Sequence, residues 1–225
     1  YPHQAGIGEM TGETRPSDGR KDAKDYGFPG YRGRLATRAV TIAEVLRDAG
    51  YRTLMTGKWH VGYLEPQLWP RRRGFDRYYG VLEGAANYFQ PDHPSYPRPF
   101  ALDDDVLHEF EPDYYATDVF TDYAIRFMRE SHALGDQPFF AYVAYTAPHW
   151  PLHAPPEDIA RYRGTYRMGW DEVRRRRHQR QVEMGIVSRN CPLSPRGEGI
   201  ASPTWKVYGG GPVPAWDSLS ETQQE

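Results

Sequence analysis

Residues 50–62 read Gly-Tyr-Arg-Thr-Leu-Met-Thr-Gly-Lys-Trp-His-Val-Gly and constrain the fold more than any other segment of this 225-residue chain. The apolar run that ends near Thr56 predicts a buried strand, and the glycines around the next residues allow a tight turn. Lys58 and His60 stand two residues apart in that turn, so an extended backbone would point both side chains the same way. A cation beside an imidazole suits a tetrahedral oxyanion, and an ordinary surface loop is the alternative interpretation.

A helix is expected directly before this strand. Residues 41–44 form a capping box, Thr-Ile-Ala-Glu, and apolar residues then recur at helical spacing up to residue 49. Gly50 follows at the position where a glycine commonly ends a helix. The sequence therefore predicts a helix and then a strand that ends at the turn with Lys58 and His60.

A second unit repeats this order of helix and strand. Thr117 is expected to cap a helix that runs to about His132, and the apolar run at residues 139–145 predicts a strand covered on both faces. Two such units indicate an α/β fold with a mostly parallel sheet flanked by helices.

Candidate catalytic residues follow both strands. Lys58 and His60 come directly after the first strand, and His149 comes shortly after the second. Chemistry gathers at the carboxyl ends of strands in open parallel sheets, so all three side chains are expected at one edge. Lys58 would supply a compact positive charge, and a histidine would transfer protons near neutral pH.

Composition divides the rest of the chain. Residues 1–38 are polar and glycine-rich and are interpreted as a surface loop, residues 39–196 as the α/β region, and residues 197–225 as an irregular connection with the start of a helix. Residues 62–116 have little periodicity and are expected to form an elaborated loop region. A further helix is predicted from residue 169 to residue 184.

Charge and composition bear on several classes of function. The formal net charge of -2 gives no field that attracts nucleic acid, and no apolar run is long enough to span a bilayer. Arg174–Arg177 is interpreted as a solvated helix face, and Asp103–Asp105 as a solvated acidic turn instead of a metal site. The single cysteine, Cys191, rules out an internal disulfide. A capping-box pattern at residues 218–221 and the absence of a Met before Tyr1 lead us to expect an internal piece of a longer protein.

Four segments together resemble the sulfatase family. Residues 50–62 match its second signature, with Thr56 in a position that is more often small and apolar. The other three occur in the family's order along the chain: Tyr1–Gly6, Arg73–Gly80 and Ala147–Pro155. The resemblance implies an alkaline-phosphatase-like sheet, here incomplete, and a sulfuric ester hydrolase acting on a small-molecule or saccharide sulfate ester. It also implies a periplasmic or secreted location, although any export signal would precede Tyr1.

The family's chemistry assigns roles to three residues. By resemblance, a formylglycine hydrate is the nucleophile and a divalent cation, usually calcium, polarises the sulfate. Lys58 matches the lysine that contacts the sulfate, and His60 matches the histidine beside the formylglycine. His149 matches the histidine that binds sulfate or protonates the leaving oxygen.

The sequence also departs from the family's pattern. It has no Cys-x-Pro-Ser-Arg motif, because the residues after Cys191 do not fall at the required offsets. The acidic pairs that bind the metal are also absent, so this chain alone is expected neither to bind calcium tightly nor to turn over. Three alternatives stay open: a phosphonate or phosphate ester hydrolase of the same superfamily, a non-catalytic module that binds anions through the arginine-rich helix, and an inert product of a truncated gene.

Overall fold

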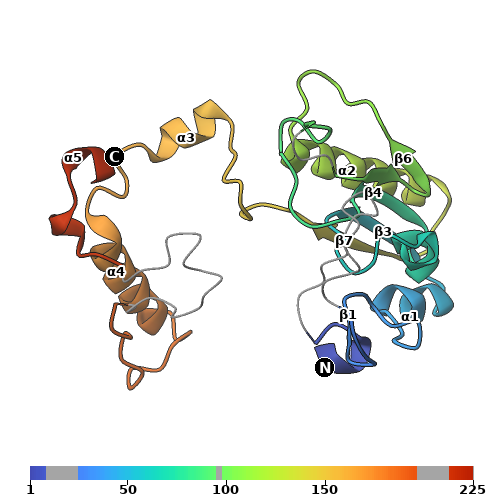
Figure 1. Ribbon diagram of the computed structural model, residues 1–225, viewed down its shortest axis with the longest axis horizontal. Helices are drawn as coiled ribbons and strands as arrows, with labels where there is room; N and C mark the ends of the chain where they lie inside the picture. The colour runs from blue at the N-terminus through green and yellow to red at the C-terminus, as the bar shows by residue number, and fades with distance from the viewer. Residues whose placement is uncertain (9–24, 95–97, 197–212, 225) are drawn as a thin grey trace. The chain divides into compact units, whose positions relative to one another are not determined.

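The structure, a computed structural model, describes residues 1–8, 25–94, 98–196 and 213–224 (Figure 1). The chain forms two compact units, residues 1–153 and residues 154–225, and each is described by itself. The first unit contains the candidate residues Lys58, His60 and His149. The domain limits expected at residues 38 and 196 stay a prediction.

A five-stranded sheet with the order β6-β5-β4-β3-β7 organises the first unit. Its central strands β4 (Arg77–Val81), β3 (Arg52–Gly57) and β7 (Phe139–Ala144) are parallel. β5 (Phe100–Leu102) and β6 (Asp105–Leu107) extend the sheet as antiparallel strands. The predicted α/β class is confirmed. The interpretation of residues 62–116 as loops is wrong, because β4 forms there beside β3, and β5 and β6 extend the sheet from β4 as an antiparallel hairpin.

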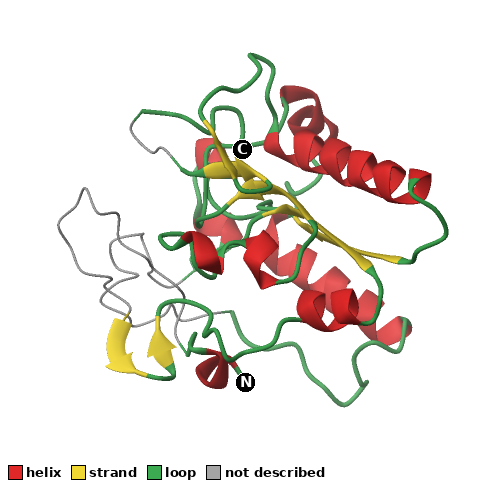
Figure 2. Ribbon diagram, turned by 90° about the vertical axis from the view of Figure 1, so that its right-hand side faces the viewer, coloured by secondary structure: helices red, strands yellow, loops and turns green. Residues whose placement is uncertain are grey.

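Side chains of the central strands alternate between two apolar clusters. Leu54 and Tyr79 belong to the cluster that includes Phe120 and Phe127 of α2 (Ala116–Ala133). Figure 2 shows long helical segments beside the sheet, and Figure 1 labels α2 next to β4. This alternation is the two-residue period of a strand that is buried on both faces.

The opposite cluster packs beneath α1 (Ile42–Asp48). It contains Met55 and Tyr78 together with Ala43 of that helix. The predicted capping box is present, because Thr41 Oγ1 accepts the Glu44 N–H at 3.0 Å and the Thr41 N–H donates to Glu44 at 2.7 Å. The first helix and strand therefore form as local sequence predicts.

Two details of the second helix–strand unit differ from expectation. Tyr115 is the N-terminal cap of α2, and Thr117 lies inside the first turn, so the predicted cap is wrong. β7 is not covered on both faces, because Phe139 is 44% exposed and Tyr142 is 49% exposed. Within the described residues β7 pairs only with β3, which leaves it at the edge of the sheet.

The polar segments of the first unit are more ordered than predicted. Within residues 1–38, η1 (Pro2–Ala5) is a short helix, and β1 (Asp25–Phe28) pairs with β2 (Tyr31–Arg32). Two further short helices, η3 (Pro66–Leu68) and η4 (Pro70–Arg73), precede β4.

The acidic turn at residues 103–105 is structural as well as solvated. Asp103 joins β5 to β6, accepts the Tyr78 N–H at 2.9 Å and pairs with Arg77 at 3.0 Å. Asp104 pairs with Arg72 at 3.3 Å. These contacts tie the antiparallel strands to the start of β4.

The second unit consists of short helices around one longer helix. They are α3 (Pro156–Tyr162), α4 (Gly169–Glu183), η6 (Trp216–Ser218) and α5 (Glu221–Gln224). The predicted helix at residues 169–184 is confirmed as α4. α5 begins after Ser220, whose N–H donates to Gln223 Oε1 at 3.0 Å, so the cap lies two residues after Ser218. The glycine-rich stretch at residues 209–211 lies outside the described residues.

Candidate active site

The Lys58–His60 loop continues the sheet beyond the end of β3. The Lys58 N–H donates to the carbonyl of Ala144 at the end of β7, at 2.8 Å. On the other side, the amides of Trp59 and His60 donate to the carbonyls of Val81 and Leu82, at 3.0 and 3.1 Å. The loop is therefore held between the carboxyl ends of β7 and β4.

Close backbone packing makes this strand end rigid. Gly57 has φ 101°, and a methyl group added there would collide with the carbonyl of Ala144. A methyl group at Gly80 of β4 would collide with Gly57 in turn. The buried hydroxyl of Tyr78 donates to the Gly57 carbonyl at 3.2 Å. Only glycine permits this approach, and the approach fixes the backbone on which Lys58 stands.

The side chain of Trp59 anchors the loop from the other end. Its indole N–H is shared between the carbonyls of Gly62 and Leu68, at 3.1 and 3.0 Å. The ring also meets Phe75 edge-on, with 6.2 Å between centroids. Trp59 therefore has a structural role in the motif.

Lys58 is half-buried just beyond the carboxyl end of β3. Burial lowers the pKa of its ammonium, and the positive charge of Arg98 lowers it further. Partial removal from water strengthens the attraction between the ammonium and a bound anion. The arrangement suits a group that holds a sulfuryl oxygen.

His60 has a left-handed backbone with φ 55°, so it is not extended as the two-residue spacing assumed. A non-glycine residue in this region is uncommon and strained, and such residues cluster at functional sites. The imidazole lies against Gly84, where an added Cβ would sit 3.3 Å from Nε2. A side chain at position 84 would therefore crowd the ring of His60, which explains the glycine there.

His149 lies in the loop that follows β7. Its side chain is exposed, and Nδ1 lies 2.6 Å from the carbonyl oxygen of Trp150. Because a carbonyl oxygen has no proton to give, Nδ1 carries the proton in this hydrogen bond. Nε2 is then the ring nitrogen that remains for proton transfer. The backbone carbonyl of His149 accepts the hydroxyl proton of buried Tyr88 at 2.7 Å. Convergence of this imidazole with Lys58 and His60 on one group stays a prediction.

Sequence reasoning missed two residues beside this loop. Glu83 follows the end of β4, and Arg98 precedes β5; their side chains form an ion pair and are 12% and 13% exposed. Arg98 is the charge that acts on Lys58. A proline-rich segment gives no local signal of a buried ion pair, so only the pairing of the strands reveals it.

Comparison with known proteins identifies the family. The family model described as Sulfatase matches residues 1–193. The chain belongs to the sulfatase family. It is 35% identical over 212 residues to "Uncharacterized sulfatase PB10D8.02c" of Schizosaccharomyces pombe (strain 972 / ATCC 24843), covering 90% of this chain and 37% of that protein. It is also 35% identical to an arylsulfatase of Klebsiella aerogenes, covering 74% of this chain and 36% of that one. The sulfatase chain described here thus spans about a third of the length of these relatives.

A solved structure agrees with the family and the fold. The crystal structure of Ps i-CgsB in complex with k-i-k-neocarrahexaose is 30% identical, with a TM-score of 0.57. The match covers 72% of this chain and 35% of that chain. The fold of most of this sulfatase chain is therefore similar to that of a solved protein.

Sulfatases generally use a metal ion, and the described residues do not fit one. No group of three or more His, Cys, Asp or Glu side chains in the described parts of the chain is arranged to hold a cation. The same parts contain no helix long and apolar enough to cross a membrane.

Most other histidines and aromatic residues of this sulfatase chain have packing roles. His153 packs in its loop: its Nδ1 accepts the Tyr88 N–H at 3.4 Å, and its ring meets Phe89 with centroids 5.7 Å apart. Tyr78, Tyr79 and Tyr88 are buried, as expected for core aromatic residues. Cys191 is an exposed free thiol.

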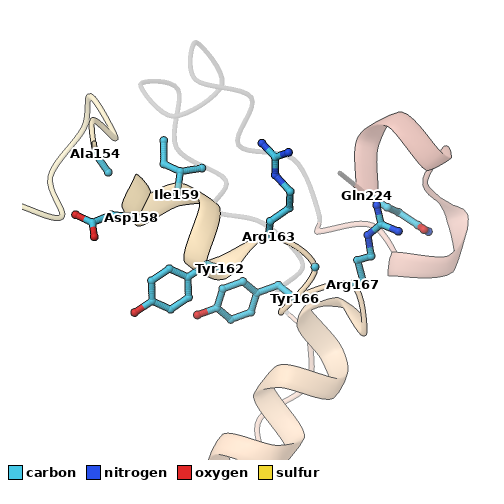
Figure 3. A pocket seen from close by; sticks show the side chains of 9 residues that line it. Ala154, Asp158, Ile159, Tyr162, Arg163, Tyr166, Arg167 and Gln224 are labelled. Carbon is cyan, nitrogen blue, oxygen red and sulfur yellow. The ribbon is translucent and has the colours of Figure 1, made fainter. Parts of the chain in front are cut away.

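The second unit of the sulfatase chain offers charged but solvated surfaces. Glu172 of α4 accepts hydrogen bonds from Arg175 and Arg176 at 2.7 Å, and these hydrogen bonds lower its pKa to about 2. An open hollow of about 750 Å³ lies beside α3. Figure 3 shows the side chains that line it, among them the stacked rings of Tyr162 and Tyr166. None of the candidate catalytic residues lines this hollow.

Proposed function

We propose that this chain carries the anion-binding and proton-transfer groups of an arylsulfatase-type sulfuric ester hydrolase. One observation carries the proposal. The Lys58 N–H···O=C bond to Ala144 brings the end of β3, with its lysine, beside the end of β7, from which the loop of His149 begins. Chemistry in parallel sheets gathers at this edge. Membership of the sulfatase family supports the nature of the substrate group.

In this proposal Lys58 binds the sulfuryl group. A sulfate monoester spreads negative charge over its oxygens, and cleavage adds charge to the leaving oxygen. The half-buried ammonium of Lys58 offers three N–H donors to those oxygens.

The two histidines divide the proton transfers. His149, with both ring nitrogens protonated, donates the Nε2 proton to the departing alcohol, while Nδ1 keeps its proton in the hydrogen bond to the Trp150 carbonyl. His60, held by its backbone contact to Leu82 and lying against Gly84, would accept the hydroxyl proton that is released when the sulfated nucleophile expels sulfate. Each role requires a pKa near neutrality, which an imidazole provides.

The nucleophile and the metal would be supplied from outside this chain. A formylglycine hydrate would provide the attacking oxygen, and Ca²⁺ would polarise the sulfate. Because the described residues do not fit a metal, no step of this chain's chemistry is assigned to one. The substrate proposed is a small-molecule or saccharide sulfate ester, supported by the saccharide ligand of the solved relative.

Turnover by the protein expressed with its natural flanking coding sequence tests the proposal. We expect hydrolysis of 4-nitrophenyl sulfate, and slower hydrolysis of a 4-nitrophenyl phosphonate monoester. Lys58→Gln should lower kcat/KM by about 10²–10³-fold. A protein that prefers the phosphonate, or a Lys58→Gln variant with normal activity, would contradict the proposal. The chain of residues 1–225 alone should show no turnover.

A further inference from the structure

A buried ion pair lies beside the candidate active site. Glu83 Oε1 and Arg98 Nη1 form the pair, and both side chains are almost excluded from water. Burying two charges is unfavourable unless each gains a partner in good geometry. Each of the two charges therefore requires the other as its partner in this part of the fold.

Three backbone segments bring this pair to the loop of Lys58. The amide of His60 donates to the carbonyl of Leu82 at 3.1 Å, and the amide of Leu82 donates to the carbonyl of Pro99 at 2.9 Å. Residues 58–60, 81–83 and 98–99 thus run side by side at the carboxyl ends of β3 and β4. Glu83 comes from the middle segment and Arg98 from the outer one.

The same segment contacts the imidazole of His60. Gly84 follows Glu83 directly, and a Cβ added to it would lie 3.3 Å from both Cε1 and Nε2 of His60. The position of the backbone at Glu83 and Gly84 is therefore coupled to the position of the His60 ring. An ion pair that fixes this segment also fixes one wall of the site.

The charges in this cluster do not cancel. Lys58 and Arg98 contribute two positive charges and Glu83 one negative charge, so the cluster carries a formal charge of +1 at neutral pH. The pKa of Lys58 is lowered first by burial and then by Arg98, which shows that the guanidinium lies within electrostatic reach. Two cations held close in a partly desolvated place attract an anion more strongly than one.

We propose that Arg98, held in place by Glu83, adds its positive charge to that of Lys58 and so strengthens binding of an anionic sulfuryl group at this site. The proposal rests on the proposed function, since it assigns the anion to the site of Lys58. It adds a second cation to the site that the sequence motif does not contain. The effect is one of charge, so a lysine at position 98 should keep most of it.

Affinity for inorganic sulfate, measured by calorimetry on the protein with its natural flanking sequence, tests this role. Arg98→Gln should weaken sulfate binding about tenfold, and Arg98→Lys should stay within about threefold of the wild type. Arg72→Gln is the matched control, because Arg72 forms an exposed ion pair with Asp104 at the start of β4. Arg72→Gln should leave sulfate binding unchanged.

A double-mutant cycle tests the part of Glu83. If Glu83 holds Arg98, then Arg98→Gln should cause a smaller loss of affinity in the Glu83→Gln background than alone. Fully additive effects would contradict the holding role. Equal losses in Arg98→Lys and Arg98→Gln would also overturn the proposal, because shape and not charge would then be responsible.

The readout separates this inference from the proposed function. Sulfate binding that depends on the charge at position 98 supports the inference even if no sulfate ester is hydrolysed, and in that case only the proposed function fails. A wild-type protein that binds no sulfate, or an Arg98→Gln variant with unchanged affinity, overturns the inference.

Discussion

The hydroxyl of Tyr88 donates a hydrogen bond of 2.7 Å to the backbone carbonyl of His149. Tyr88 is buried, whereas His149 is exposed. A fixed residue of the core thus holds the loop that carries the proposed acid. Burial raises the pKa of Tyr88, so the phenol keeps the proton that makes this bond.

Tyr88→Phe removes this bond and keeps the ring. We expect the free energy of unfolding to fall by about 0.5–1.5 kcal/mol. We expect kcat/KM for 4-nitrophenyl sulfate to fall about three- to tenfold, because His149 loses its fixed position. Urea unfolding and steady-state kinetics check both values. Loss of stability with unchanged kinetics would show that the bond does not position His149.

Two histidines of the same loop separate proton transfer from packing. His149→Asn should lower kcat/KM for 4-nitrophenyl sulfate by about 10²–10⁴-fold, the usual contribution of a general acid. His153→Asn is the matched variant, because His153 packs on Tyr88 and Phe89. It should change the melting temperature more than the rate. Similar rate losses in both variants would argue against a special role for His149.

Two glycines with positive φ separate backbone strain from steric collision. Gly50 has φ 88° and open space where a Cβ would stand, whereas Gly57 has φ 101° and would collide with Ala144. Gly50→Ala should lower the free energy of unfolding by about 1 kcal/mol. Gly57→Ala should lower it by about 3 kcal/mol or more, because the β3–β7 pairing must shift. Urea unfolding compares them, and equal losses would mean that the close approach carries little energy.

Buried tyrosines predict loss of stability at alkaline pH. Burial raises the pKa of Tyr79 from 10.0 to about 12; its hydrogen bond with Tyr114 opposes this in part, and the neighbouring Tyr123 adds a smaller increase. Burial also raises the pKa of Tyr114. The unfolded chain therefore loses these protons first, and stability that is complete below pH 10 declines as the pH rises toward 12.

Tyr114→Phe removes one of these groups. Its free energy of unfolding should fall less steeply than that of the wild type as the pH rises from 10 toward about 12, because an unfolded Tyr114 loses its proton above its ordinary pKa of 10.0 whereas the folded one keeps it. Urea unfolding at several pH values measures the slopes. Identical slopes would show that Tyr114 does not control alkaline stability.

Local signals explain what the sequence revealed about the fold. α1 follows from the Thr41–Glu44 capping box, and β3 follows from the apolar run that ends near Thr56. Both signals lie within a few residues of the element that they predict. The parallel arrangement of β3 and β7 could also be predicted from the sequence, because the order of helix and then strand is repeated along the chain.

Long-range pairing explains what the sequence did not reveal. β5 and β6 are short, and they form because β4 offers Gly80 and Val81 as partners for Ala101 and Phe100. The ion pair of Glu83 with Arg98 depends on that same pairing. The left-handed backbone of His60 likewise has no local signal in the sequence.

Crystals of the protein with its natural flanking sequence, grown with inorganic sulfate, give the most direct measurement. The account predicts one sulfate ion with an oxygen about 3 Å from Lys58 Nζ and another within hydrogen-bond reach of His149 Nε2. An ion bound away from Lys58, or a His149 ring on the opposite face of the sheet, would contradict it.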